Sequence, residues 1–225
     1  MTNAARPGGA LTRRPLHFFY LVDCSGSMSF DGKIQALNTA VREAIPHMRD
    51  TAANNPEAEV LVRVIKFDDG ASWHVPSPTP VDQFTWTDLD AGGTTAMGKA
   101  LNLVAEQLEP PNAPDRGMRP VIVLISDGQP TDDFKGGLKR LLSSAWGSKA
   151  VRIAIAIGRD ADQDVLQEFI SHPEYKPLSA DNPEALIQLI IWTSTVPIEI
   201  ASRPKDDNAV PVPQPVQVSG GTEPW

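Results

Sequence analysis

Five oxygen-bearing side chains in this sequence are spaced so that they could surround one metal ion. Asp23, Ser25 and Ser27 occupy alternate positions, so in a tight loop their side chains turn to the same side. Thr94 follows two glycines, and Asp127 follows a strongly apolar run. Carboxylates and hydroxyls are hard ligands that suit Mg²⁺ or Mn²⁺, with water or a foreign oxygen completing an octahedron. With so few anionic ligands, the ion would keep much of its positive charge and could attract a carboxylate from another molecule.

The segments around these residues alternate between apolar runs and helical patterns. Continuous apolar runs, typical of strands buried on both faces, cover 17–22, 59–67, 121–126 and 151–158, and a short edge strand is possible at 71–75. Apolar residues at helical spacing predict helices near 34–48, 97–108, 133–146, 165–170 and 185–192. This alternation predicts an α/β fold with a mostly parallel central sheet, helices on both faces and one short antiparallel edge strand. Ligands of such folds bind beyond the carboxyl ends of the strands, where Asp23 and Asp127 fall.

The same five positions resemble the metal-ion-dependent adhesion site of von Willebrand factor type A (VWA) domains. The sequence motifs DCSGSM, GGT and SDGQPTD are similar to those of the bacterial tellurium-resistance TerY-like branch of that family. The resemblance implies one Rossmann-like domain. In it, Ser25, Ser27 and Thr94 would bind the metal directly, and Asp23 and Asp127 would bind it directly or through water. It also implies that an acidic residue of a protein partner completes the metal shell. The ion would be Mg²⁺, with Mn²⁺ or Ca²⁺ as alternatives, and the partner a kinase or phosphatase of a bacterial stress or tellurite-response system.

Composition and charge fit one globular domain with tails. The chain has 225 residues, of which 41% are hydrophobic and 21% charged, and its formal net charge is −8. We expect a flexible leader at 1–14, the folded domain at 15–202 and a proline-rich, disordered tail at 203–225. The acidic balance argues against nucleic-acid binding, and no apolar stretch has the length of a membrane span or signal-peptide core. We expect a cytoplasmic, monomeric protein that binds neither nucleic acid nor membranes.

Other functions compete with metal-dependent protein binding. A haloacid-dehalogenase-like phosphohydrolase also has an aspartate after its first strand, but it needs a second acid two residues later, where this chain has Ser25. A metal-free scaffold could instead act through the polyproline pattern at 212–215. Asp23 and Asp127 could also simply cap the helices that follow them. The sequence favours a non-enzymatic, divalent-metal-dependent interaction module without catalytic residues.

Three further features have plain explanations. Residues 93–99 match GxxxxGK of a phosphate-binding loop, but Ala100 stands where a Ser or Thr must follow, and no apolar strand precedes the segment. Cys24 is expected to face the core, because the alternation turns it away from the metal. A rim that reads a partner could be formed by Met28, Phe30, Trp86, Gln129 and Pro130.

Overall fold

A six-stranded sheet forms the centre of the molecule, with strand order β3-β2-β1-β4-β5-β6. The computed structural model describes residues 13–113 and 115–201. The strands are β1 (Arg14–Asp23), β2 (Ala58–Phe67), β3 (Ala71–Pro80), β4 (Val121–Ser126), β5 (Val151–Ile157) and β6 (Leu178–Ala180). β3 pairs antiparallel with β2, and the other pairs are parallel. The predicted α/β class and mostly parallel sheet are confirmed.

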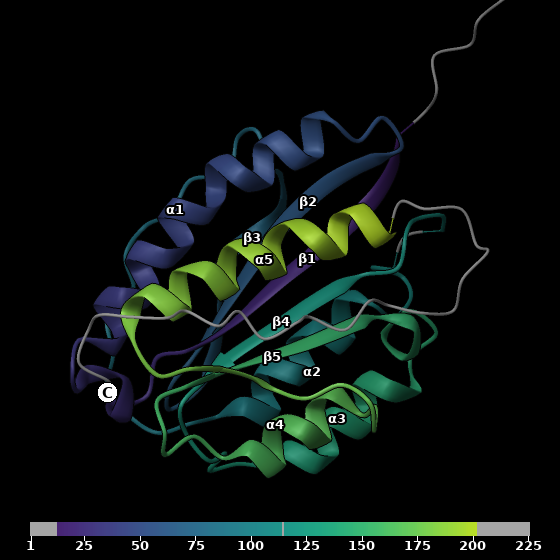
Figure 1. The fold of residues 1–225 in the computed structure, drawn as a ribbon. Coiled ribbons are helices and arrows are strands. Elements are labelled where there is room, and N and C mark those ends of the chain that lie inside the picture. Colours follow the sequence, from purple (N-terminus) through teal and green to yellow (C-terminus); the bar gives the residue numbers. More distant parts are fainter. Residues whose placement is uncertain (1–12, 114, 202–225) are drawn as a thin grey trace, which may run out of the picture.

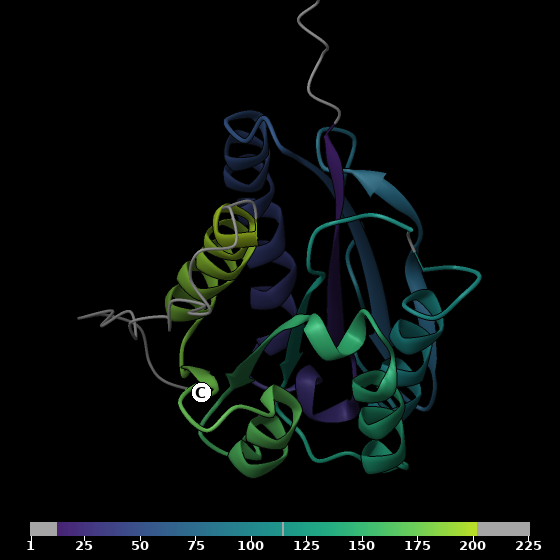
Figure 2. The same ribbon diagram turned by 90° about the vertical axis from the view of Figure 1, so that its right-hand side faces the viewer.

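Helices cover both faces of this sheet (Figures 1 and 2). They are α1 (Lys33–Ala53), α2 (Met97–Gln107), α3 (Phe134–Ser143), α4 (Gln163–Ile170) and α5 (Pro183–Ala201), with 3₁₀ turns η1 (Gly26–Ser29) and η2 (Gly147–Lys149). Buried residues of α1 and α5 share one apolar cluster, and those of α2, α3 and α4 share a second one. The sheet separates the two clusters, so the domain has three layers.

The central strand β1 explains why its sequence is continuously apolar. Phe18 and Tyr20 belong to the cluster on the α1/α5 face, whereas Phe19 and Leu21 belong to the cluster on the opposite face. Successive side chains of a strand point to opposite faces, so a strand covered on both sides has no solvent-facing set. The buried Tyr20 hydroxyl also makes a hydrogen bond with the hydroxyl of Ser194 in α5.

Side chains cap the starts of α4 and α5. The Asp162 carboxylate accepts hydrogen bonds from the amides of Asp164 and Val165, both at 3.1 Å. The Asn182 side chain accepts one from the amide of Ala185 at 2.8 Å. These side chains pair amides that have no partner within the helix.

The structure departs from the sequence prediction at both edges of the sheet. The antiparallel edge strand β3 is not short: it covers 10 residues and continues through Pro76, Pro78 and Pro80. Prolines at alternate positions are tolerated there because an edge strand pairs on one side only. At the other edge, β6 is three residues long and has no distinctive sequence pattern.

The predicted chain ends lie almost wholly outside the described residues. The leader at 1–14 overlaps them only at Arg13 and Arg14, and Arg14 already begins β1. The tail at 203–225 lies entirely outside them. Within the described ranges, no helix is both long and apolar enough to cross a membrane.

Candidate metal site

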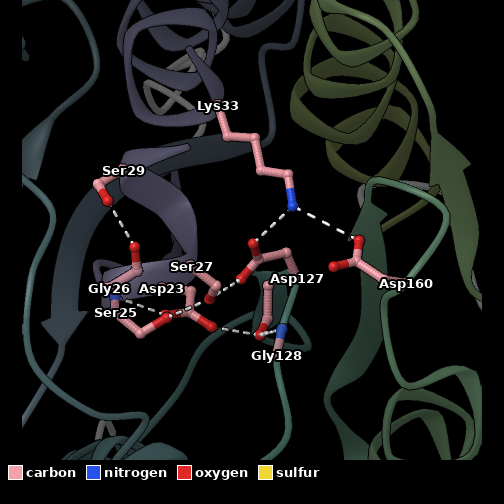
Figure 3. A network of polar contacts seen from close by, with 10 residues as sticks. Asp23, Ser25, Gly26, Ser27, Ser29, Lys33, Asp127, Gly128 and Asp160 are labelled. Carbon is pink, nitrogen blue, oxygen red and sulfur yellow. Dashed lines mark hydrogen bonds and ion pairs between the residues drawn. The ribbon is translucent and has the colours of Figure 1, made fainter. Parts of the chain in front are cut away.

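Parallel pairing brings the ends of β1 and β4 to the same edge of the sheet. Val22 pairs with Ile125, so the next residues, Asp23 and Ser126, lie side by side and Asp127 follows directly. The Asp23 carboxylate accepts two hydrogen bonds: Oδ1 from the Ser25 amide at 2.8 Å and Oδ2 from the Ser126 hydroxyl at 2.5 Å. Both contacts fix the carboxylate at the start of the loop that follows β1 (Figure 3). Ser126 was not among the predicted site residues.

The two serines of this loop connect it to Asp127. Ser27 Oγ donates to Asp127 Oδ1 at 2.7 Å, and the hydroxyls of Ser25 and Ser27 lie 3.0 Å apart. Because Ser27 gives its one proton to Asp127, the Ser25 hydroxyl donates to Ser27. The structure therefore joins predicted residues from two separate loops in one chain of hydrogen bonds (Figure 3).

The glycine pair brings a third loop against the first. The Gly26 amide donates to the carbonyl of Gly93 at 3.0 Å, and the Gly92 amide donates to the carbonyl of Cys24 at 2.7 Å. Gly93 has φ +77°, and a Cβ added there would lie 2.8 Å from the Asp69 carboxylate. The turn therefore requires glycine at position 93, for its backbone conformation and for space.

The threonine that reaches the site is Thr95, one residue after the predicted Thr94. Thr94 is exposed, and its amide donates to Asp69 Oδ1 at 2.9 Å. Thr95 is buried, and its amide donates to the Thr131 hydroxyl at 3.1 Å. The turn at Gly93 decides which of the two adjacent threonines faces inward, and residue types alone do not show the direction of the backbone in a turn.

Three side-chain oxygens surround an open position next to Gly128. A Cβ added to Gly128 would lie 3.4 Å from Thr95 Oγ1, 3.7 Å from Asp23 Oδ2 and 3.7 Å from Ser27 Oγ. These oxygens come from two loops, the one after β1 with Asp23 and Ser27 and the one before α2 with Thr95, and they include one carboxylate. Among the described residues, no group of three or more His, Cys, Asp or Glu side chains could hold a metal. A divalent ion at this edge would therefore depend on the hydroxyls, and the donor set fits a hard cation such as Mg²⁺.

The electrostatics of the two aspartates differ. Burial raises the pKa of Asp23 from 3.8 to about 6, against the hydrogen bonds from Ser126 and Ser25, and the nearby charge of Asp127 raises it further. A buried carboxylate favours its neutral form unless a cation is close. The Asp127 carboxylate has such a cation, because Lys33 Nζ lies 2.8 Å from its Oδ2.

Lys33 is a site residue that the sequence analysis missed. It is the first residue of α1, and its ammonium also lies 3.5 Å from Asp160 Oδ1 in the loop after β5 (Figure 3). Burial alone would lower the pKa of Lys33, but the hydrogen bond and charge of Asp127, with Asp160, raise it above its usual value. The ammonium therefore stays charged. The only signal in the sequence was a lysine directly before the apolar face of the helix.

Features that suggested other chemistry have structural roles. The segment resembling a phosphate loop cannot offer its helix amides to a phosphate, because Asp132 accepts hydrogen bonds from the amides of Gly98 and Lys99, each at 2.8 Å. Cys24 is buried in the core as expected, and burial raises the pKa of its thiol to about 12, with a further contribution from Asp23.

The predicted rim is only partly at the surface. Met28 is buried in the core and cannot contact a partner. Trp86 is partly buried and donates to the Asn38 side chain at 2.9 Å, which gives it a structural role. Phe30, with 67% of its surface exposed, and Gln129 lie in loops that follow strands.

The chain thus combines a mostly parallel α/β sheet with hydroxyls and carboxylates gathered beyond the ends of its strands. A model of the von Willebrand factor type A domain matches residues 19–190, and the chain belongs to this family. No curated protein matches the chain.

Solved structures share the fold at low sequence identity. A von Willebrand factor type A protein from Catenulispora acidiphila aligns with a TM-score of 0.62 and 17% identity, over 83% of this chain and 43% of that one. The pilus adhesin SpaC from Lactobacillus rhamnosus GG gives a TM-score of 0.64 and 16% identity, over 84% and 30% of the two chains. Proximal thread matrix protein 1 from the mussel byssus was solved with zinc in its MIDAS (metal-ion-dependent adhesion site) motif. It aligns with a TM-score of 0.57 and 16% identity, over 83% of this chain and 46% of that one. This chain thus spans less than half the length of each of these proteins.

Proposed function

We propose that this protein is a non-enzymatic interaction module in which a divalent ion, Mg²⁺ in the first place and Mn²⁺ or Ca²⁺ as alternatives, bridges to an acidic side chain of a protein partner. The observation that carries the proposal is the meeting of Asp23 Oδ2, Ser27 Oγ and Thr95 Oγ1 around the open position at Gly128. A solved neighbour with a zinc-occupied metal-ion-dependent adhesion site (MIDAS) supports divalent metal binding by a domain of this fold.

The proposed ligands are Asp23, Ser25, Ser27, Thr95 and Asp127, with Thr95 in the position first assigned to Thr94. The hydroxyls would bind the ion directly. Asp127 would act at least in part by orienting Ser27, to which it is already hydrogen-bonded. When bound, the ion supplies an electrophilic position for a carboxylate, and the three hydroxyl ligands add no negative charge to that of Asp23 and Asp127.

The exposed side chains near the site suit protein binding. Phe30 offers an apolar contact beside a charged site, a combination that favours a protein partner over a small anion. By resemblance to the TerY-like branch, we propose a bacterial stress or tellurite-response context with a kinase or phosphatase as the partner. We also propose that the protein is monomeric and acts in the cytoplasm.

The test combines metal binding with partner capture. Calorimetry measures Mn²⁺ and Mg²⁺ binding to wild type, to Asp23→Ala and to Asp90→Asn. Asp90 is an exposed carboxylate ahead of the glycine turn, so its variant is the matched control. Pull-downs from a bacterial lysate then compare wild type in Mg²⁺, wild type in EDTA and the two variants in Mg²⁺.

The proposal predicts that wild type and Asp90→Asn bind metal and retain the same proteins. Wild type in EDTA and folded Asp23→Ala are expected to retain none of them. Equal retention in all four samples, or a wild type that binds neither ion, contradicts the proposal. Turnover of a phosphoester by the wild type would instead favour the phosphohydrolase alternative.

A further inference from the structure

Lys33 occupies a position that ordinary helix and burial preferences disfavour. It is the first residue of a 21-residue helix, where the helix dipole repels a positive charge. Its side chain is only 5% exposed, and burial of an ammonium ion is costly unless the charge is paired. A residue that breaks two local preferences at the edge of a functional site requires a reason in the site itself.

The surrounding loops are shaped to hold this ammonium. Gly158, after β5, has φ +82°, and a Cβ added there would lie 3.1 Å from Lys33 Nζ. On the other side, Nζ lies 2.8 Å from Asp127 Oδ2. Asp160, whose side chain is 75% exposed, is the outer and more weakly held partner at 3.5 Å. The two carboxylate oxygens of Asp127 therefore have different partners: Oδ2 pairs with Lys33, and Oδ1 accepts a hydrogen bond from Ser27.

We propose that Lys33 sets the net charge of the metal site, and thereby weakens metal binding while strengthening the hold of the loaded site on a partner's carboxylate. Among the buried groups, Asp23 and Asp127 contribute −2 and Lys33 contributes +1, so a site loaded with a divalent ion carries +1; Asp160 is left out of this sum because its side chain is 75% exposed and screened by solvent. Without Lys33 the loaded site would be neutral. The inference rests on the proposed function, and it assigns to Lys33 an electrostatic role beyond the positioning of Asp127.

The charge of Lys33 acts in opposite directions on the two binding steps. It repels the incoming cation, because both are positive and the site is partly buried, where screening is weak. It attracts the carboxylate that binds afterwards. A residue that only positioned Asp127 would change both steps in the same direction, since a displaced Asp127 would impair the site for metal and partner alike.

The experiment uses the full chain with Lys33→Met, which removes the charge, and Lys33→Arg, which keeps it. Lys33→Gln is a second neutral variant that keeps a hydrogen-bond donor. Circular dichroism checks each fold, and calorimetry measures Mn²⁺ affinity. Acetate is the carboxylate probe: its binding to the Mn²⁺-loaded protein is followed through the fall in water-proton relaxation as bound water is displaced.

We expect Lys33→Met and Lys33→Gln to bind Mn²⁺ about tenfold more tightly or better, and acetate at least about threefold more weakly, with Lys33→Arg close to wild type. Weaker or unchanged Mn²⁺ binding in the neutral variants, or unchanged acetate binding, overturns the inference. Failure of both neutral variants to fold also overturns it, because Lys33 would then be a structural residue. If the wild type binds no Mn²⁺, the proposed function itself fails, which separates the two outcomes.

Discussion

Alanine substitution of the two adjacent threonines is the sharpest test of the site geometry. Thr95 Oγ1 lies beside the open position at Gly128, whereas Thr94 is exposed and uses its backbone amide to bind Asp69. Thr95→Ala removes one neutral oxygen ligand. A polar contact to a charged group contributes about 1.5–3 kcal/mol, so we expect metal affinity to fall about 10- to 150-fold. Thr94→Ala is expected to change it by less than about twofold, because the backbone contact remains.

The fold of both variants is expected to survive. Thr95 is tied to its surroundings through its backbone, since its amide binds the Thr131 hydroxyl and its carbonyl accepts from the Thr131 amide at 2.9 Å. The substitution keeps both contacts. At the exposed Thr94, we expect a stability change within about 0.5 kcal/mol.

Calorimetric titration with Mn²⁺ at pH 7 measures the affinities, and urea unfolding in EDTA measures the stabilities. A Thr94→Ala variant that loses metal while Thr95→Ala keeps it would refute the assignment and restore the prediction from the sequence. Equal losses in both variants would mean that the turn moves when metal binds.

Three other results are expected. Burial raises the pKa of Asp23 to about 6, so protons compete with the metal for this carboxylate below pH 7. Mn²⁺ affinity measured by titration should therefore fall about tenfold from pH 7 to pH 5. A change of less than twofold contradicts the pKa shift. Gly93→Ala should lower the free energy of unfolding by about 1–3 kcal/mol in urea denaturation, because φ is +77° and the added carbon would meet the Asp69 carboxylate. Gly92→Ala, with nothing within 4 Å of its added carbon, is the control and should differ little from wild type. Cys24, with a pKa of about 12, should resist iodoacetamide at pH 7.5 and react only in urea, so rapid labelling of the folded protein would contradict its burial.

The sequence predicts those parts of the site that are attached to strongly patterned elements. Asp23 and Asp127 come at the ends of continuous apolar runs, and parallel strands end at one edge of the sheet, so the hydrophobic pattern places both at that edge. That they lie side by side depends on the pairing of β1 with β4. The alternate positions of Ser25 and Ser27 likewise bring their hydroxyls within 3.0 Å of each other, and Ser27 against Asp127. These relations depend on local periodicity, which residue types reveal.

The unpredicted parts depend on backbone direction or on contacts between distant segments. Whether Thr94 or Thr95 faces inward depends on one φ angle at Gly93. Lys33 reaches Asp127 only because α1 begins above the end of β4, a tertiary relation between residues 94 positions apart. The three residues of β6 have too little pattern to show that they pair with β5. β3 continues beyond the predicted range of 71–75, through three prolines, because it pairs with β2 as far as Pro80.

The carboxylates of both aspartates at this edge have hydrogen-bond donors from the chain itself. Asp23 has the Ser25 amide and the Ser126 hydroxyl, and Asp127 has Ser27 and Lys33. A divalent ion at this edge would compete with these hydrogen bonds and with the Lys33 ammonium. The stability of the fold comes from the two apolar clusters on either side of the sheet.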